Sequence, residues 1–184
     1  MIKTQEELDI KIKTLLKDTK IYNYGYKNNK DKGQWGSLID QYLNEKNNTK
    51  KGQDVEGIAE FKSKEYGKEN KGEIEICKTG KQNKKFNALQ EAYEKAKNIY
   101  LFLYEIKFED ITQNIHGIDF TYKNLPYIVV KEVRKYLNLD EEKFRQTINF
   151  REKKDYNQIY FSNLKKMEDN YPRILTTTLW RRYI

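Results

Sequence analysis

Apolar side chains recur at helical spacing in three stretches of the chain. These stretches are residues 4–17, 35–43 and 84–98. In the second, Trp35 begins a series of apolar residues spaced three and four apart, which is typical of a helix with one buried face. In the first, Thr4 precedes a pair of glutamates, and these residue types favour a helix N-terminus. The pattern therefore predicts helices over all three stretches.

Strand patterns follow in the middle of the chain. Side chains alternate between two faces on both sides of a charged turn in residues 57–79, which predicts a β-hairpin. Residues 99–108 are strongly apolar and predict a central strand. Residues 126–137 begin with proline, which is common in the first turn of a helix. They predict a helix, although their Ile-Val-Val run leaves a strand open.

Shorter elements complete the chain. Asp140 is a candidate cap of a short helix, residues 158–162 predict a strand, and residues 173–184 end the sequence. No internal repeat and no Pro-rich or Ser-rich linker divides the chain. We therefore expect one domain over residues 1–184, with an α/β fold in which a mixed central β-sheet is flanked by helices.

Charge narrows the class of protein. The chain has 36 Lys and Arg against 28 Asp and Glu, a net charge of +8. A basic excess favours a polyanionic partner because neutralised phosphates release counterions, but a biased genome composition would give the same excess. No stretch approaches the roughly 20 apolar residues of a membrane span, and the N-terminus lacks a signal peptide's uninterrupted apolar core. The sequence predicts a cytoplasmic protein with no membrane association.

One cysteine and one histidine limit the metal chemistry. Cys77 cannot form an internal disulfide, and Cys77 with His116 cannot complete a Cys/His zinc site. We expect Cys77 to be a small buried side chain and His116 to lie in a loop or at the surface. Any metal must then be held by carboxylates.

Residues 54–62 carry the most informative chemistry. In a strand, Glu60 and Lys62 project from the same face, and a bend could bring the carboxylate of Asp54 beside that of Glu60. Two carboxylates in one cleft suit a hard cation such as Mg²⁺, and a neighbouring lysine can hold a water or stabilise a phosphoryl oxygen. This set is typical of phosphodiester hydrolysis. The alternative is an ordinary surface ion pair on a hairpin. Glu73 and Glu75 lack a lysine at the same spacing.

These residues carry a resemblance to a known family. Residues 32–40 (KGQWGSLID), Asp54 and residues 57–62 (GIAEFK) resemble the N-terminal motif block of the MutH-type endonucleases, within the Asp…Glu-x-Lys nuclease superfamily. The block covers about a sixth of the chain. The resemblance implies a restriction-endonuclease-like core in which Asp54 and Glu60 bind the metal and Lys62 is the catalytic lysine.

The resemblance also makes Asp40 the helix carboxylate that supports the metal site. Two features depart from the family: glutamate is usual at the position of Asp40, and one more residue is usual between Asp54 and Glu60. On a helical wheel, Asp40 lies off the apolar stripe of its helix, which predicts a side chain facing solvent.

Basic residues beside the motifs and near the C-terminus are candidates for DNA contact. They are Lys32, Lys81, Lys84, Arg181 and Arg182. Lysine suits phosphate positioning, and arginine can hold phosphates or read guanine edges. Alternatively, the C-terminal segment is a strand that completes the sheet.

The sequence thus predicts a Mg²⁺-dependent endonuclease that hydrolyses phosphodiester bonds in double-stranded DNA, of the type II restriction class. The resemblance implies a GATC-like target. A homodimer would match a palindromic target, because one active site cuts one strand. A non-catalytic DNA-binding module, and a nuclease acting on RNA or branched DNA, are the alternatives.

Overall fold

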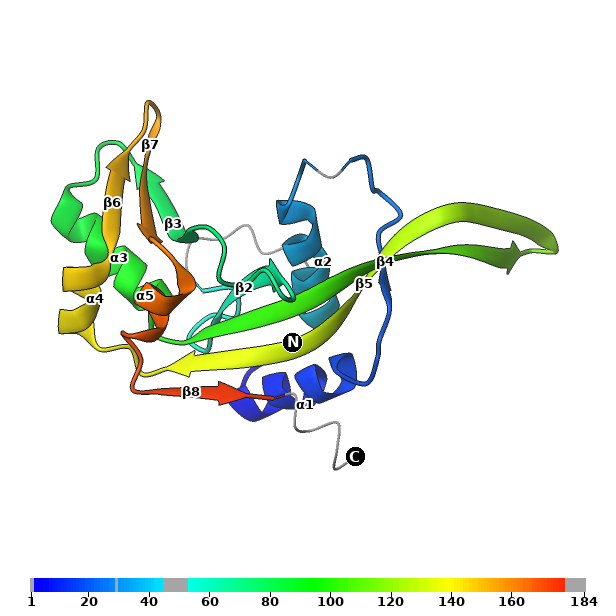
Figure 1. Cartoon of the computed structure of the whole chain (residues 1–184), viewed down its shortest axis with the longest axis horizontal. Helices are drawn as coiled ribbons and strands as arrows, with labels where there is room; N and C mark the ends of the chain where they lie inside the picture. Colours follow the sequence, from blue (N-terminus) through cyan, green and yellow to red (C-terminus); the bar gives the residue numbers. More distant parts are fainter. Residues whose placement is uncertain (1, 29, 45–52, 178–184) are drawn as a thin grey trace.

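Two β-sheets organise the molecule. The computed structural model describes residues 2–28, 30–44 and 53–177, and within them helices flank two sheets (Figure 1). The main sheet is mixed, with the strand order β1-β5-β4-β2, and β8 also pairs with β5. The second sheet is antiparallel, with the order β3-β7-β6. This architecture confirms the predicted mixed central sheet flanked by helices.

A long antiparallel hairpin runs through the main sheet. It is formed by β4 (Ile99–Ile115) and β5 (Ile118–Leu137). His116 and Gly117 make its turn, and both have a positive φ, as tight two-residue hairpin turns require. The half of the hairpin nearer the body is buried, which confirms the central strand predicted over residues 99–108, and the other half projects as an exposed ribbon (Figure 1).

The segment 126–137 is a strand, so the predicted helix is wrong. Pro126 lies opposite Phe108 in the β4–β5 ladder. On its other edge, β5 pairs with β1 (Ile21–Tyr22) and with β8 (Arg173–Thr176). The Ile-Val-Val run fits a pleated surface, and partners from both ends of the chain hold it there. These distant partners outweigh the local helix signal of the proline.

Residues 57–79 contain two strands that do not pair with each other, so the predicted hairpin is also wrong. β2 (Glu60–Glu65) runs parallel to β4, with Glu60 opposite Ile99. β3 (Ile74–Gly80) instead pairs with β7 in the second sheet. A parallel pair needs a crossover connection. Here the crossover holds β3 and α3.

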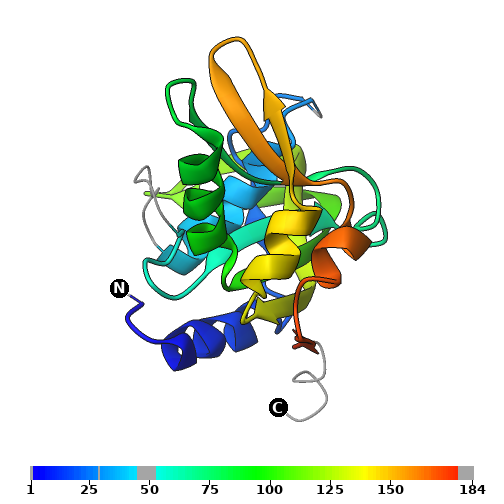
Figure 2. The same ribbon diagram turned by 90° about the vertical axis from the view of Figure 1, so that its left-hand side faces the viewer.

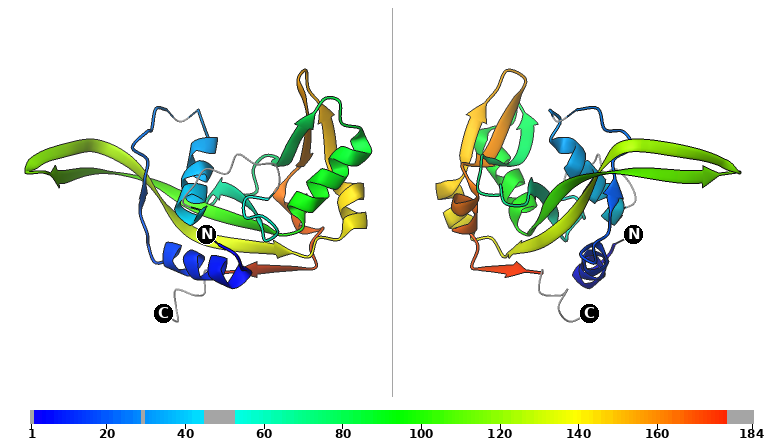
Figure 3. Two further views of the ribbon diagram at one scale, coloured as in Figure 1. Left: turned by 180° about the vertical axis from the view of Figure 1, so that it is seen from behind. Right: turned by 45° about the vertical axis from the view of Figure 1, so that its right-hand side comes forward.

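Both faces of the first, buried part of β4 are covered. The remaining elements are α1 (Gln5–Leu15), α2 (Gly33–Asn44), α3 (Lys85–Ala96), α4 (Glu141–Thr147), α5 (Leu164–Glu168), β6 (Asn149–Glu152) and β7 (Tyr156–Phe161). Tyr100 and Phe102 pack in one apolar cluster with α1 and α2. Leu101 and Leu103 pack in another with α3, α4, α5 and the second sheet, which lie together at one end of the main sheet (Figures 2 and 3).

The locally encoded elements agree with the sequence. α1, α2 and α3 confirm the three predicted helices. The side chain of Thr4 accepts the N–H of Glu7 at 3.1 Å, and that of Asp140 accepts the N–H of Lys143 at 2.8 Å, so both predicted caps are confirmed. Among the described helices, none is long and apolar enough to cross a membrane.

Candidate active site

The predicted catalytic side chains line one cavity of about 250 Å³. They are Asp40, Asp54, Glu60 and Lys62. Asp40 comes from α2, Asp54 from the turn that precedes β2, and Glu60 and Lys62 from β2 itself. The cavity therefore lies where a helix meets the edge strand of the main sheet.

A tight turn folds Asp54 back onto β2. Val55 and Ala59 exchange two backbone hydrogen bonds of 3.0 Å each. Gly57 has a φ of 73°, a conformation that glycine adopts without strain. The turn lets the Asp54 Oδ2 accept the N–H of Phe61 at 2.7 Å. The Asp54 carboxylate thereby becomes an electrostatic neighbour of Glu60.

Glu60 is a buried carboxylate, only 5% exposed. Its Oε1 lies 3.5 Å from the Nζ of Lys62, and its Oε2 receives no hydrogen bond from a donor in the described part of the chain. Burial raises the pKa of Glu60 to about 7; the Lys62 ammonium opposes this shift and the Asp54 carboxylate adds to it. Because a buried oxygen without a donor is costly, a cation beside Glu60 would be stabilising.

Asp40 is half-buried in the cavity, so the solvent-facing position predicted from the helical wheel is wrong. The core side of α2 is formed by Trp35, Ile39 and Leu43. Asp40 adjoins that side and faces the cavity shared with Asp54. Burial raises the pKa of Asp40, the hydrogen bond from Asn44 opposes the shift, and Asp54 adds to it.

Asn44 connects the helix to the turn. Its Nδ2 donates to the carboxylate of Asp40 and, at 3.4 Å, to the backbone carbonyl of Asp54. The sequence pattern did not identify Asn44. The available signal was its spacing of four residues from Asp40 on a predicted helix, which puts both side chains on the same side.

Lys62 projects from the same face of β2 as Glu60, as alternation in a strand requires. Its Nζ donates to the backbone carbonyl of Ile76 at 3.2 Å, and its side chain is 22% exposed. Ile76 belongs to β3, so this bond spans the two sheets. The ammonium is thereby held beside the Glu60 carboxylate and remains partly accessible.

Asp54 and Glu60 fit a hard divalent cation. They offer carboxylate oxygens, one of which has no protein donor. Within the described ranges, no group of three or more Asp, Glu, His or Cys side chains is placed to hold a metal, so Asp40, Asp54 and Glu60 do not form such a group. Mg²⁺ binds through one or two carboxylates and keeps several waters, whereas zinc sites use more nitrogen and sulfur ligands. The donor set therefore suits Mg²⁺.

Neighbouring titratable residues have structural partners. Glu73 forms an ion pair with Arg151 at 2.7 Å, and Glu75 accepts a hydrogen bond from Gln158. Cys77 is buried, as expected, and burial raises the pKa of its thiol to about 11. A thiol with a raised pKa is a poor nucleophile at neutral pH.

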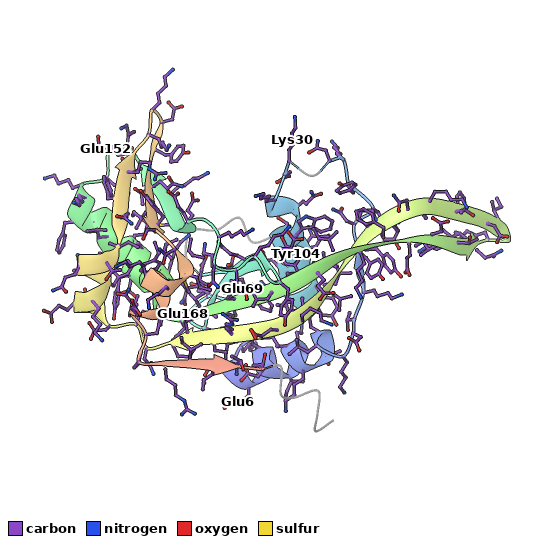
Figure 4. All side chains as sticks on the ribbon, in the orientation of Figure 1. Glu6, Lys30, Glu69, Tyr104, Glu152 and Glu168 are labelled. Atoms are coloured by element: carbon purple, nitrogen blue, oxygen red, sulfur yellow. The ribbon has the colours of Figure 1, made fainter. Side chains whose placement is uncertain are left out.

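A second cavity, of about 730 Å³, adjoins the first, and Ser63 lines both. Its walls are the start of α2, the second half of β2 and the loop that follows β2, and its floor is β4. Figure 4 marks Tyr104 on β4 and Glu69 on that loop. The two cavities therefore lie side by side along β2 and share this one lining residue.

The predicted DNA-binding lysines separate into two locations. Lys32 lines the larger cavity. Lys81 and Lys84 are exposed on the connection from β3 to α3, and neither of them lines a cavity described above. The Nζ of Lys81 lies 4.0 Å from the Oε2 of Glu152, and Figure 4 marks Glu152 at the end of the second sheet. Arg181 and Arg182 lie outside the described residues.

Comparison with known proteins places the fold. No family model and no curated protein matches this sequence. The structure is similar to that of the restriction endonuclease MvaI, solved as a complex with its cognate DNA substrate, with a TM-score of 0.56 and 10% sequence identity. The match covers 95% of this chain and 99% of that one. The chain therefore has a restriction-endonuclease-like fold.

Proposed function

We propose that this protein is a Mg²⁺-dependent endonuclease that hydrolyses phosphodiester bonds in double-stranded DNA, and that it is a type II restriction enzyme of the cytoplasm. The observation that carries the proposal is the meeting of Asp54, Glu60 and Lys62 in one cavity of a restriction-endonuclease-like fold. The solved structure with a similar fold contains a DNA substrate.

Each side chain has a separate role in this proposal. Asp54 and Glu60 hold the cation, which acts as a Lewis acid and lowers the pKa of water when bound. The Lys62 ammonium, fixed by the Ile76 carbonyl, donates to an oxygen of the attacked phosphate or to the attacking water. Asp40 acts through Asn44, which also bonds the Asp54 backbone, and so positions the turn.

The finer assignments are part of the same proposal. The motif block favours a MutH-type relationship and a GATC-like target. One acidic cavity per chain would cut one strand, so cleavage of both strands of a palindrome favours a homodimer. We further propose that residues 1–184 act as one domain.

A cleavage assay tests the proposal. Purified protein is incubated with double-stranded DNA, RNA and branched DNA, in Mg²⁺ or in EDTA. We expect cleavage of duplex DNA in Mg²⁺ and none in EDTA. Lys62→Ala should reduce the rate by about 100-fold or more, since one donor to the developing charge is lost.

Lys143→Ala is the matched control, because Lys143 is an exposed lysine on α4. It should cut like the unchanged protein. Cleavage that persists in EDTA, or that Lys62→Ala leaves untouched, would refute the mechanism. Tight DNA binding without cleavage of any substrate would favour a non-catalytic DNA-binding module. Faster cleavage of RNA or branched DNA would mean that double-stranded DNA is not the preferred substrate.

A further inference from the structure

The larger cavity is rich in lysine. Its basic side chains are Lys32, Lys64, Lys68 and Lys71. They come from three separate parts of the chain: the turn before α2, the strand β2 and the loop after β2. Two carboxylates, Glu65 and Glu73, line the same cavity. Whether the cavity attracts an anion therefore depends on which of these charges are already paired.

Both carboxylates have partners. Glu65 pairs with Lys68 at 3.2 Å, and Glu73 pairs with Arg151 at 2.7 Å. In the described part of the chain, no carboxylate lies within 4.0 Å of the ammonium groups of the other three lysines, Lys32, Lys64 and Lys71. The cavity therefore holds surplus positive charge.

Lys64 lies in line with the proposed catalytic residues. Because side chains two apart share a face, Glu60, Lys62 and Lys64 form one row along β2, with successive members about 6.6 Å apart. The Nζ of Lys64 donates to the backbone carbonyl of Lys71 at 2.6 Å, which holds the ammonium at the cavity. Burial and the charge of Lys32 lower the pKa of Lys64. An anion bound between Lys32 and Lys64 would stabilise the charged form of Lys64, because it would offset both the desolvation of that ammonium and its repulsion by Lys32.

We propose that Lys32 and Lys64 form a subsite for a backbone phosphate of the DNA strand, next to the phosphate that is cleaved beside Glu60 and Lys62. The inference rests on the proposed function, because it assigns a further contact to the same substrate. Lysine is a compact point charge that suits phosphate, and phosphate contacts set the position of a strand without reading its sequence. The subsite fixes which phosphate enters the acidic cavity.

The salt dependence of DNA binding tests the subsite. Binding of a mixed-sequence DNA duplex is measured in EDTA over a range of salt concentrations, so that cleavage does not interfere. Each phosphate contact that is removed should reduce the slope of log affinity against log salt by about one. We expect this reduction in Lys32→Gln and in Lys64→Gln, and about twice the reduction in the double variant.

Two further variants separate charge from folding. Lys143→Gln removes one exposed charge on α4 and should leave the slope nearly unchanged. Lys64→Arg keeps the charge and should retain the slope; a loss equal to that of Lys64→Gln would mean that the loop contact, not the phosphate, was removed, and would overturn the proposal.

The failure of this inference differs from failure of the proposed function. If Lys32→Gln and Lys64→Gln bind with the slope of Lys143→Gln while the unchanged protein cuts DNA, the subsite is wrong and the nuclease proposal stands. If the unchanged protein neither binds nor cuts duplex DNA, both are wrong.

Discussion

A buried oxygen without a hydrogen-bond donor distinguishes Glu60 from the other two carboxylates of the acidic cavity. Its Oε2 has no donor among the described residues, whereas Asp54 accepts the N–H of Phe61 and Asp40 accepts from Asn44. In the absence of a cation, the buried carboxyl favours its neutral form, because ionisation would leave that oxygen charged and unsolvated. Metal binding and the ionisation of Glu60 should therefore be coupled.

This coupling predicts a pH-dependent stability of the metal-free protein. The pKa of Glu60 is raised to about 7 from its ordinary value of 4.5, so the folded state holds a proton that the unfolded state releases. The contribution of protonated Glu60 to the stability of the folded state is complete below pH 4.5 and is lost as the pH rises through 7. Urea unfolding in EDTA should show a loss of up to about 3 kcal/mol between these limits.

Two variants isolate the contribution of Glu60. Glu60→Gln should remove that part of the pH dependence, since glutamine does not titrate. Glu56→Gln is the matched control, because Glu56 is exposed in the same turn. Equal pH profiles for the unchanged protein and Glu60→Gln would contradict the coupling.

Asn44 offers a second test at the level of one side chain. Asn44→Ala removes both hydrogen bonds that connect α2 to the Asp54 turn. The rate of DNA cleavage should fall by about 10- to 100-fold, as for other residues that orient metal ligands, with DNA affinity in EDTA unchanged. Asn87→Ala, at an exposed site on α3, should match the unchanged protein in both measurements. A normal cleavage rate in Asn44→Ala would exclude this positioning role.

At the scale of elements, the site depends on the close approach of α2 to β2. A Cβ added at Gly36 would lie 2.8 Å from the Oγ of Ser63. Alanine favours a helix by about 1 kcal/mol over glycine, but here the Ser63 hydroxyl would have to move. We expect Gly36→Ala alone to gain less than this amount, and Gly36→Ala with Ser63→Ala to gain nearly all of it.

Urea midpoints of the single and double variants measure this coupling. Ser63→Ala alone is the control that removes the hydroxyl while leaving Gly36. If Gly36→Ala alone gains the full helix preference, α2 and β2 are not packed closely enough for the contact to matter.

The elements that the sequence predicted are those whose signals are local. Thr4 and Asp140 cap helices within three residues of themselves, and Trp35 belongs to a periodic pattern inside one helix. Residues 126–137 were misassigned because their strand conformation depends on pairing with β4, β1 and β8, which lie far away in the chain. The hairpin over residues 57–79 was wrong for the same reason.

In the candidate site, too, the sequence predicted the residues that are close together in the chain and missed the contacts between distant segments. Asp54, Glu60 and Lys62 could be predicted to lie together because they fall within nine residues and the alternation of one strand relates two of them. The partner of Lys62 is a carbonyl of the second sheet, and the half-buried position of Asp40 depends on the turn it faces. Such tertiary neighbours leave no periodic signal in the sequence.

At the scale of the molecule, part of the excess positive charge, +8 over the whole chain, lies around the larger cavity. Among the described residues, lysines without a carboxylate partner line the larger cavity, which shares Ser63 with the acidic cavity. Lysines in the larger cavity would attract a polyanion, while the carboxylates of the neighbouring acidic cavity would remain available to bind a cation. Composition alone indicated only the sign of the partner's charge.

The parallel pairing of β2 with β4 sets the order in which the molecule can assemble. All of β3 and α3 must be synthesised before β4 exists, so closing this pair is a long-range step in folding. A nascent chain that ends before Ile99 already carries Asp54, Glu60 and Lys62, yet it has no strand on which to align them. The cavity that these three residues line should therefore form only after synthesis has passed β4, just beyond the middle of the chain, and a shorter chain should not form the proposed site.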